Sequence, residues 1–188
     1  MEKGKRIILG IDPGSIIMGY AVIEIQGPDM KLKTLDVIKP GSSKDTYKRL
    51  EIIFTKTCAV IDEYKPNAFA IEAPFFGKNV QSMLKLGRAQ GVAIAAAMQY
   101  AIEVTEYSPK KVKQAVTGNG NASKEQVFKM LQLIFNIEKE PKYLDATDAL
   151  AVALCHHYET SNGVVLKAKG FKGWDEFLAK NQHRVKKK

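Results

Sequence analysis

The feature that most restricts the fold of this chain is a short apolar run that ends on a carboxylate. Residues 6–15 read Arg-Ile-Ile-Leu-Gly-Ile-Asp-Pro-Gly-Ser, so a buried strand ends at Asp12 and a Pro-Gly turn follows. The same arrangement returns at residues 68–72, where Ala-Phe-Ala-Ile leads to Glu72 and then to Ala-Pro. Open α/β sheets place their chemistry at the carboxyl ends of strands. A single acid there is equally well explained as a turn residue, so the interpretation depends on whether further acids reach the same place.

The order of short apolar runs and helical stripes predicts an α/β protein. Three strands are expected first, then two strands that alternate with helices, then three helices. The expected strands cover residues 7–12, 18–25, 31–39, 68–72 and 102–107. The expected helices cover residues 47–64, 79–100, 109–116, 123–135 and 144–158. A meander followed by β-α-β crossovers predicts a mixed five-stranded sheet, a three-strand antiparallel meander plus parallel strands, flanked by helices.

Length and composition favour one globular domain over residues 1–160, followed by a tail over 161–188. The chain has 188 residues, and 45% of them are hydrophobic, which is enough for a core that needs no stabilising disulfide or metal. The tail is basic and irregular, as disordered DNA-binding arms are. No apolar stretch has the length of a signal core or a membrane span, so the cytoplasm is expected and a membrane is not an expected partner. Cys58 and Cys155 are expected to be reduced thiols.

The charge of the chain indicates a polyanionic partner. The formal net charge is +9, and eight basic against two acidic residues follow position 160. Further basic residues cluster at positions 110–113 and around Lys85 and Arg88, which are candidate DNA contacts. A basic surface favours nucleic acid as a partner, although it says nothing about chemistry and is also common on merely soluble proteins.

A second pair of acids lies in the last predicted helix. Asp145 and Asp148 are three residues apart, so they share one helix face among small and apolar neighbours. Complementing the helix dipole is an alternative role, and it is weaker for two acids than for one. Clustered with Asp12 and Glu72, these acids would raise one another's pKa unless a cation relieved the repulsion. Mg²⁺ prefers such ligands, and two ions about 4 Å apart can activate water and stabilise the leaving oxygen of a phosphodiester, which is nuclease chemistry.

An ordered set of short segments also resembles one family. The segments cover residues 10–15, 70–72, 84–93, 112–114 and 145–151. Together they resemble, collinearly over about residues 6–158, the RuvC family of bacterial Holliday-junction resolvases. The resemblance implies a ribonuclease-H-like fold, a homodimer and cleavage that depends on Mg²⁺, with Mn²⁺ as a substitute. It also implies symmetric nicking of four-way junction DNA in recombination and repair, with 5′-phosphate ends, and a branch-migration motor as a further partner.

The same resemblance implies the catalytic and metal-binding residues. The family's four catalytic acids, with two metal ions expected per site, correspond to Asp12, Glu72, Asp145 and Asp148. The third of these positions is sometimes His in relatives, so Asp145 indicates the version of the site that is built entirely from carboxylates. His156 and His157 follow two turns later and are expected to be packing or surface residues rather than ligands.

Candidate DNA contacts carry over from the family with their alternatives. Phe75 matches an aromatic residue that stacks on a base near the junction point, but the neighbouring Phe76 competes for this role and a packing role is also open. Lys113 and Lys124 match basic residues that contact phosphates, against the ordinary fate of a solvated lysine. Gly14 is hypothesised to keep side-chain bulk away from the scissile phosphate.

Three other functions stay open from the residues alone. A sugar-kinase or actin-like ATPase also opens on a strand that ends in Asp-x-Gly, but such folds need two lobes and 188 residues are few for that. A protein that binds junctions without cutting them would not need four acids. A nuclease of the same fold that acts on another nucleic acid, such as precursor ribosomal RNA, is separated from a resolvase only by its substrate.

Overall fold

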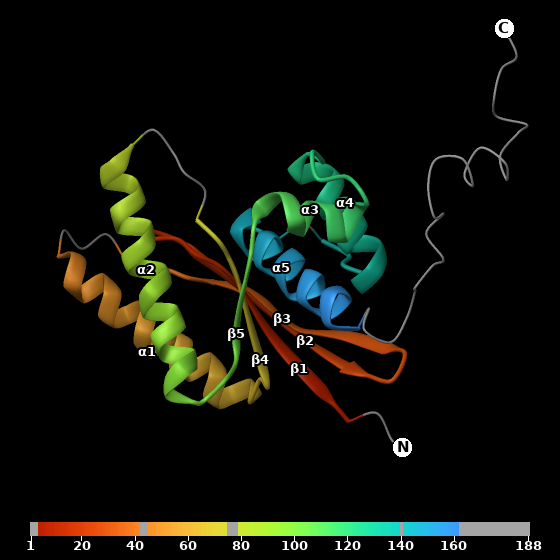
Figure 1. Ribbon diagram of the computed structural model, residues 1–188, viewed down its shortest axis with the longest axis horizontal. Helices are drawn as coiled ribbons and strands as arrows, with labels where there is room; N and C mark the ends of the chain where they lie inside the picture. Colours follow the sequence, from red (N-terminus) through yellow and green to blue (C-terminus); the bar gives the residue numbers. More distant parts are fainter. Residues whose placement is uncertain (1–3, 42–44, 75–78, 140, 162–188) are drawn as a thin grey trace, which may run out of the picture.

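The computed structural model describes residues 4–41, 45–74, 79–139 and 141–161 and shows a mixed sheet between two layers of helices (Figure 1). The strands are β1 (Arg6–Asp12), β2 (Met18–Gln26), β3 (Asp29–Ile38), β4 (Ala68–Glu72) and β5 (Val104–Tyr107). The helices are α1 (Thr46–Tyr64), α2 (Val80–Gln99), α3 (Pro109–Thr117), α4 (Lys124–Phe135) and α5 (Leu144–Ser161). The predicted order of elements is confirmed. Of the tail expected over 161–188, Ser161 is the last residue of α5, and the rest lies outside the described residues.

The sheet has the order β3-β2-β1-β4-β5, with β1 at its centre. Strand β1 pairs antiparallel with β2, which pairs antiparallel with β3, so the predicted meander is present. On its other side β1 pairs parallel with β4, and β4 pairs parallel with β5. Ile11 of β1 lies opposite Ile71 of β4. The next residue of each strand is an acid, so Asp12 and Glu72 leave the sheet side by side.

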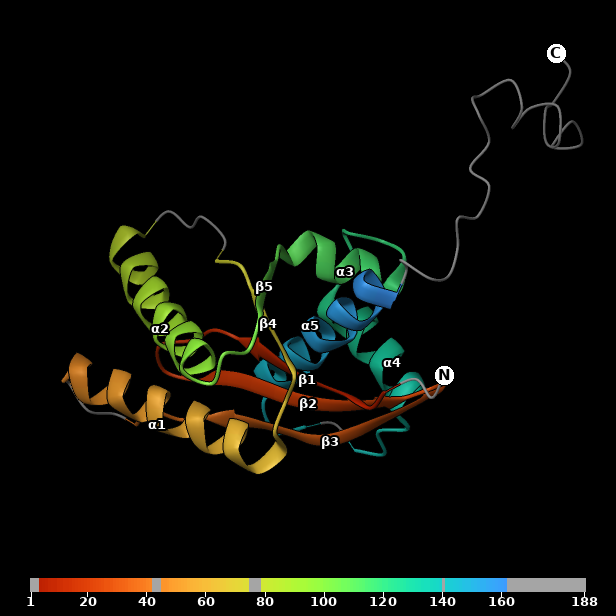
Figure 2. The ribbon, with the colours of Figure 1, turned by 60° about the horizontal axis from the view of Figure 1, so that its bottom comes forward.

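Each face of the sheet has its own core and its own helices. Helices α1 and α2 cover one face, and α3, α4 and α5 cover the other (Figure 2). Strand β1 serves both cores because successive side chains of a strand point to opposite faces. Ile8 belongs to the core on the α5 side, whereas Leu9 and Ile11 belong to the core on the α1 side, and all three are buried.

Helix α5 lies unusually close to the sheet because two strand positions in front of it are glycines. A Cβ atom added to Gly10 would come within 2.3 Å of the Ala149 carbonyl oxygen, and one added to Gly19 would come within 1.8 Å of the Asp145 carbonyl oxygen. Glycine in a strand interior often marks such a close backbone approach. The two glycines therefore fix where the first two turns of α5 lie relative to the ends of β1 and β2.

Helix starts follow the predicted caps within one residue, whereas β3 begins at Asp29, two residues earlier than expected, and α5 ends at Ser161, three residues later than expected. Ser108 caps α3, and Ser123 forms a capping box with Gln126 at α4. Strand β5 begins at Val104, two residues later than expected, because Ala101 has a φ of 53° and the Ile102 amide bonds back to the Ala97 carbonyl oxygen. Residues 100–103 are thus used to turn the chain out of α2.

None of the helices over the described residues is both long enough and apolar enough to cross a membrane.

Candidate active site

Three of the four predicted acids line one cavity at the carboxyl end of the central strands. Asp12 comes from the end of β1, Glu72 from the end of β4, and Asp148 from the second turn of α5. The cavity has a volume of about 240 Å³. Asp145 does not line it, but this acid is close enough for its charge to act on Asp12. The structure therefore gathers all four predicted acids around Asp12.

The acids are held in an environment that opposes their ionisation. Burial, followed by the charges of Glu72, Asp148 and Asp145, raises the pKa of Asp12 to about 8. Burial, followed by the charge of Asp148, raises the pKa of Glu72 to about 7. Both carboxyl groups would carry their full negative charge only above neutral pH unless a cation joined them. Such a set of perturbed acids in a cavity is typical of a functional site.

Two lysines complete the wall of the cavity. Lys113 comes from α3 and Lys124 from the first turn of α4. The Lys124 ammonium group donates a hydrogen bond of 2.5 Å to Asp148 Oδ2. Burial acts to lower the pKa of Lys124, but the hydrogen bond to Asp148 and the charges of the acids outweigh it and raise the pKa. One ammonium group thus balances only part of the negative charge of the cluster.

The donor set fits a hard divalent cation in its chemistry. All four acids offer carboxylate oxygens, which Mg²⁺ and Mn²⁺ prefer. The side chains as they stand do not form a closed cage, because no three acidic, histidine or cysteine residues among those described gather tightly enough to hold an ion. Lys124 occupies one carboxylate, and mutual repulsion disfavours bringing the others closer. A cation would remove that repulsion.

The predicted DNA contacts separate into three groups. Lys113 and Lys124 lie in the wall of the acidic cavity. Lys85 and Arg88 lie exposed on α2, whose helix covers the opposite face of the sheet, and neither lines the cavity. Phe75 lies outside the described residues.

The histidines have the packing role that was expected. His156 is only 5% exposed and is hydrogen-bonded to Tyr107 and Arg6. His157 is half-buried beside Ser161. Neither residue belongs to the acidic cavity.

Sequence reasoning missed the glycines that position the site. Gly10 and Gly19 allow α5 to bring Asp145 and Asp148 next to Asp12, and their place in the interior or at the end of apolar strands was the available signal. The structure explains the glycine at position 14 without the hypothesised need to keep bulk away from the scissile phosphate. A Cβ atom there would lie 1.6 Å from the Ile17 carbonyl oxygen, so the tightness of the loop after β1 by itself requires glycine.

Comparison with known proteins gives one consistent result. A family model described as crossover junction endodeoxyribonuclease RuvC matches residues 8–156. The crossover junction endodeoxyribonuclease RuvC of Christiangramia forsetii is 52% identical over 98% of this chain and 95% of its own. That of Bacteroides fragilis is 50% identical over 97% of each chain. The structure of T. thermophilus RuvC in complex with a Holliday junction substrate is 31% identical and superposes with a TM-score of 0.79 over 84% of this chain and 96% of its own.

Proposed function

The chain belongs to the RuvC family of crossover junction endodeoxyribonucleases, and on that premise we propose that it resolves four-way DNA junctions at its cluster of four acids. It is an endonuclease with a ribonuclease-H-like fold that acts on Holliday junctions in recombination and repair. The proposal assigns catalysis and metal binding to Asp12, Glu72, Asp145 and Asp148, with Mg²⁺ as the ion and two ions per site.

The observation that carries the proposal is the convergence of acids and lysines in one cavity. Asp12, Glu72 and Asp148 lie in it together with Lys113 and Lys124. Carboxylates without enough countercharge attract divalent cations, and exposed ammonium groups attract phosphates. A phosphodiester in contact with both is the substrate that uses every charged group in the cavity.

The division of work among the residues follows from where they lie. Asp12 and Glu72 offer their oxygens from adjacent strand ends, Asp148 offers its own from α5, and Asp145 lies near enough for its charge to act on Asp12, so together they would hold the cations. When bound, such ions would supply an activated water and stabilise the leaving oxygen of the phosphodiester. Lys113 and Lys124 orient the strand by binding phosphate oxygens. In the free protein the Lys124 ammonium group is hydrogen-bonded to Asp148. When DNA fills the site, this group releases the carboxylate and binds a phosphate oxygen instead.

Symmetric cleavage requires two copies of the site, and we propose a homodimer. A four-way junction offers two equivalent strands, which suits a two-fold symmetric dimer. Helix α2 offers a surface for it: Val80, Leu84 and Met98 are more than half exposed, and a Cβ atom added to Gly87 or Gly91 would meet none of the described residues within 4 Å. Each protomer would then leave a 5′-phosphate on one strand. A branch-migration motor belongs to the same proposal as a further partner.

The experiment that tests the function compares substrates and one substitution. A synthetic four-way junction, a duplex of the same sequence and an RNA are incubated with the protein and Mg²⁺. The wild-type protein is expected to cut the junction in preference to the other two. Asp12→Asn is expected to lower the cleavage rate roughly a thousandfold, because a lost ligand removes several kcal/mol of charge stabilisation in the transition state.

A matched control separates this effect from a general loss of negative charge. Asp29 lies exposed at the start of β3, so Asp29→Asn should cut at the wild-type rate. Junction binding without metal should survive in Asp12→Asn, since phosphate contacts dominate affinity. Cleavage of RNA but not of junctions would contradict the resolvase function while keeping the nuclease. Cleavage by Asp12→Asn at the wild-type rate would contradict the site.

A further inference from the structure

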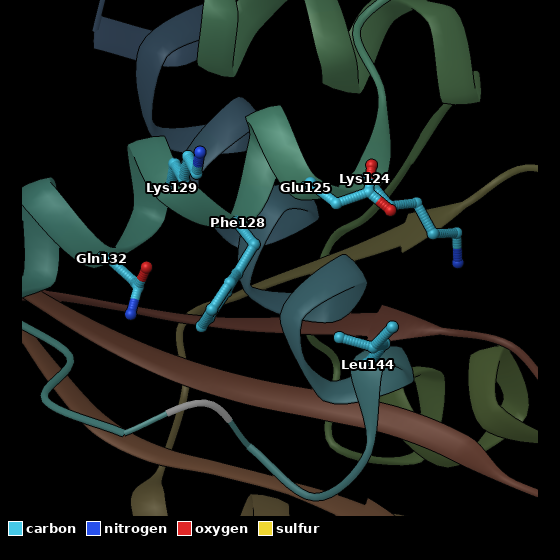
Figure 3. Close-up of a pocket in the computed structure, with 6 residues that line it drawn as sticks. All are labelled: Lys124, Glu125, Phe128, Lys129, Gln132 and Leu144. Atoms are coloured by element: carbon cyan, nitrogen blue, oxygen red, sulfur yellow. The ribbon is translucent and has the colours of Figure 1, made fainter.

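A second cavity lies directly beside the acidic one, between α4 and the start of α5. It has a volume of about 300 Å³ and is lined by Lys124, Glu125, Phe128, Lys129, Gln132 and Leu144. In Figure 3, Phe128 and Gln132 point from the same side of α4 toward the segment before α5, and Leu144 faces them from the first turn of α5. Lys124 extends away from these two side chains in Figure 3, and it also lines the acidic cavity. The function described above makes no use of this cavity.

The lining combines three kinds of contact that a nucleotide needs. Phe128 is 9% exposed and Leu144 is 42% exposed, so an aromatic ring that is fixed by packing faces an aliphatic side chain that is open to solvent. Gln132 lines the cavity and donates one hydrogen bond to the Ile137 carbonyl oxygen, and its amide group carries both donors and an acceptor. Aromatic rings stack on bases, and amides read their polar edges. The volume is at the lower end of that found for small-molecule sites, which suits a single base with its sugar.

Lys124 lies between the two cavities. It lines both of them, and its ammonium group is hydrogen-bonded to Asp148 of the acidic cavity. A strand whose phosphate contacts Lys124 beside the acids would therefore place a neighbouring nucleotide over Phe128. Lys129 adds a second cation at the rim for the next phosphate. Glu125 also lines the cavity, but the two lysines outnumber this one acid, which suits a nucleic acid strand better than it suits an apolar peptide.

We propose that this cavity holds one nucleotide adjacent to the scissile phosphate, and that Phe128, Gln132 and Leu144 make cleavage depend on the identity of its base. The inference rests on the proposed function, because it takes the DNA strand to the acidic cavity first. The residues are specificity-determining rather than catalytic, since none of them lies among the four acids.

The test measures preference and not only rate. Junctions are prepared in which each nucleotide beside the scissile phosphate is varied in turn, and single-turnover cleavage rates are measured with Mg²⁺. Leu144→Trp fills the cavity, and Gln132→Leu removes its amide. Both variants are expected to reduce the ratio between the best and the worst sequence by at least fivefold. Leu133→Trp is the matched control, because Leu133 is 75% exposed on the same helix and does not line the cavity.

A cross-link shows contact directly. A junction carrying 5-iodouracil beside the scissile phosphate is irradiated with the protein in EDTA, and the modified peptide is identified by mass spectrometry. The link is expected on the α4 peptide that contains Phe128, and it should be lost in Phe128→Leu, which keeps an apolar side chain in the core. This measurement does not depend on whether Leu144→Trp disturbs the neighbouring Asp145.

Several results would overturn the inference. An unchanged preference in both variants, or an equal loss of rate on every sequence, would show that the cavity does not read a base. A cross-link elsewhere, with Phe128 unmodified, would show that the strand takes another path, and binding of a protein segment would then be the remaining use of the cavity. A wild-type protein that cuts no junction would remove the proposed function first, and the inference would fall with it.

Discussion

The two ends of helix α5 differ in whether their polar side chains are paired. At its start, Asp145 and Asp148 face Asp12, and negative charges gather with too few partners. At its end, His156 and Thr160 face Arg6 in a network in which every member has a partner. Both ends are packed against the same strand, β1, so burial alone does not explain the difference. The unbalanced end is the one that the proposed function uses, and the balanced end holds the helix in place.

The hydrogen bonds at the balanced end, around His156 and Thr160, assign the position of the proton on His156. Arg6 Nη1 donates to Thr160 Oγ1 at 2.8 Å, and Arg6 Nη2 lies 3.2 Å from His156 Nε2. Arginine can only donate, so Nε2 must accept and His156 is neutral, with its proton on Nδ1. That proton is donated to the Tyr107 hydroxyl, 3.0 Å away. Burial, followed by the charge of Arg6, lowers the pKa of His156 in agreement with this assignment.

The largest effect is expected from an amide at the unbalanced end. Glu72→Gln should lower junction cleavage roughly a thousandfold, since a proposed ligand of the cation is lost. The free energy of unfolding in EDTA should not fall, because a buried acid whose pKa is raised to about 7 is replaced by a neutral group of the same shape. Cleavage rates and urea denaturation check the two statements. Cleavage at the wild-type rate by Glu72→Gln, or a much lower free energy of unfolding, would contradict the contrast drawn between the two ends of α5.

The reverse result is expected at the balanced end. His156→Leu leaves the buried Tyr107 hydroxyl and one partly buried Arg6 nitrogen without this partner, which should lower the free energy of unfolding by about 2 kcal/mol. Cleavage below the unfolding temperature should stay near the wild-type rate. Denaturant titration and a junction assay at 25 °C measure both. A large loss of cleavage in a folded protein would mean that this network also positions the acids.

A change of pH should separate the two ends within one protein. Asp12 has a raised pKa, so its contribution to stability in EDTA is present near pH 4 and is lost as the pH rises through about 8. His156 has a lowered pKa, so its contribution is present above about 6.5 and is lost as the pH falls through the folded value. The stability difference between Asp12→Asn and wild type should therefore grow between pH 6 and 8.5. A difference that is constant with pH would contradict the raised pKa.

The smallest effect tests the geometry of the balanced end. Arg6→Lys keeps the charge but replaces a planar fork with one ammonium group, which cannot reach both Thr160 and His156 in the same way. The expected cost is about 1 kcal/mol of stability with no change in cleavage. Thermal unfolding in EDTA measures it, and Lys33→Arg on the exposed part of β3 serves as the control for the reverse exchange. An effect as large as that of His156→Leu would mean that the charge of residue 6, and not its fork, holds the network.

Much of the fold was predictable because it depends on neighbours in the sequence. The strand that ends at Asp12, the turn at Pro13-Gly14 and the capping box at Ser123 are local features, and the structure contains each of them. The order of strands and helices followed from periodicity together with the rule that crossovers are short. The late start of β5 was missed, because the left-handed turn at Ala101 has no strong residue signature.

The candidate site was only partly predictable. The four acids could be named from strand ends, helix spacing and a family resemblance. No pattern of neighbouring residues shows that Gly10 and Gly19 let α5 pack closely against the sheet. The cavity that contains Phe128 and Gln132 was likewise missed, since it is formed between α4 and the start of α5.

The sequence by itself determined which residue types stand where each strand and helix begins or ends, since these follow from spacing along the chain. Only the tertiary structure decided which acids are left without partners and which polar groups are paired. The reason is that burial and charge act through space. Asp12 and Glu72 become weaker acids because they are buried near the charge of Asp148 on α5, and His156 becomes a neutral packing residue because Arg6 and Tyr107 reach it from other elements.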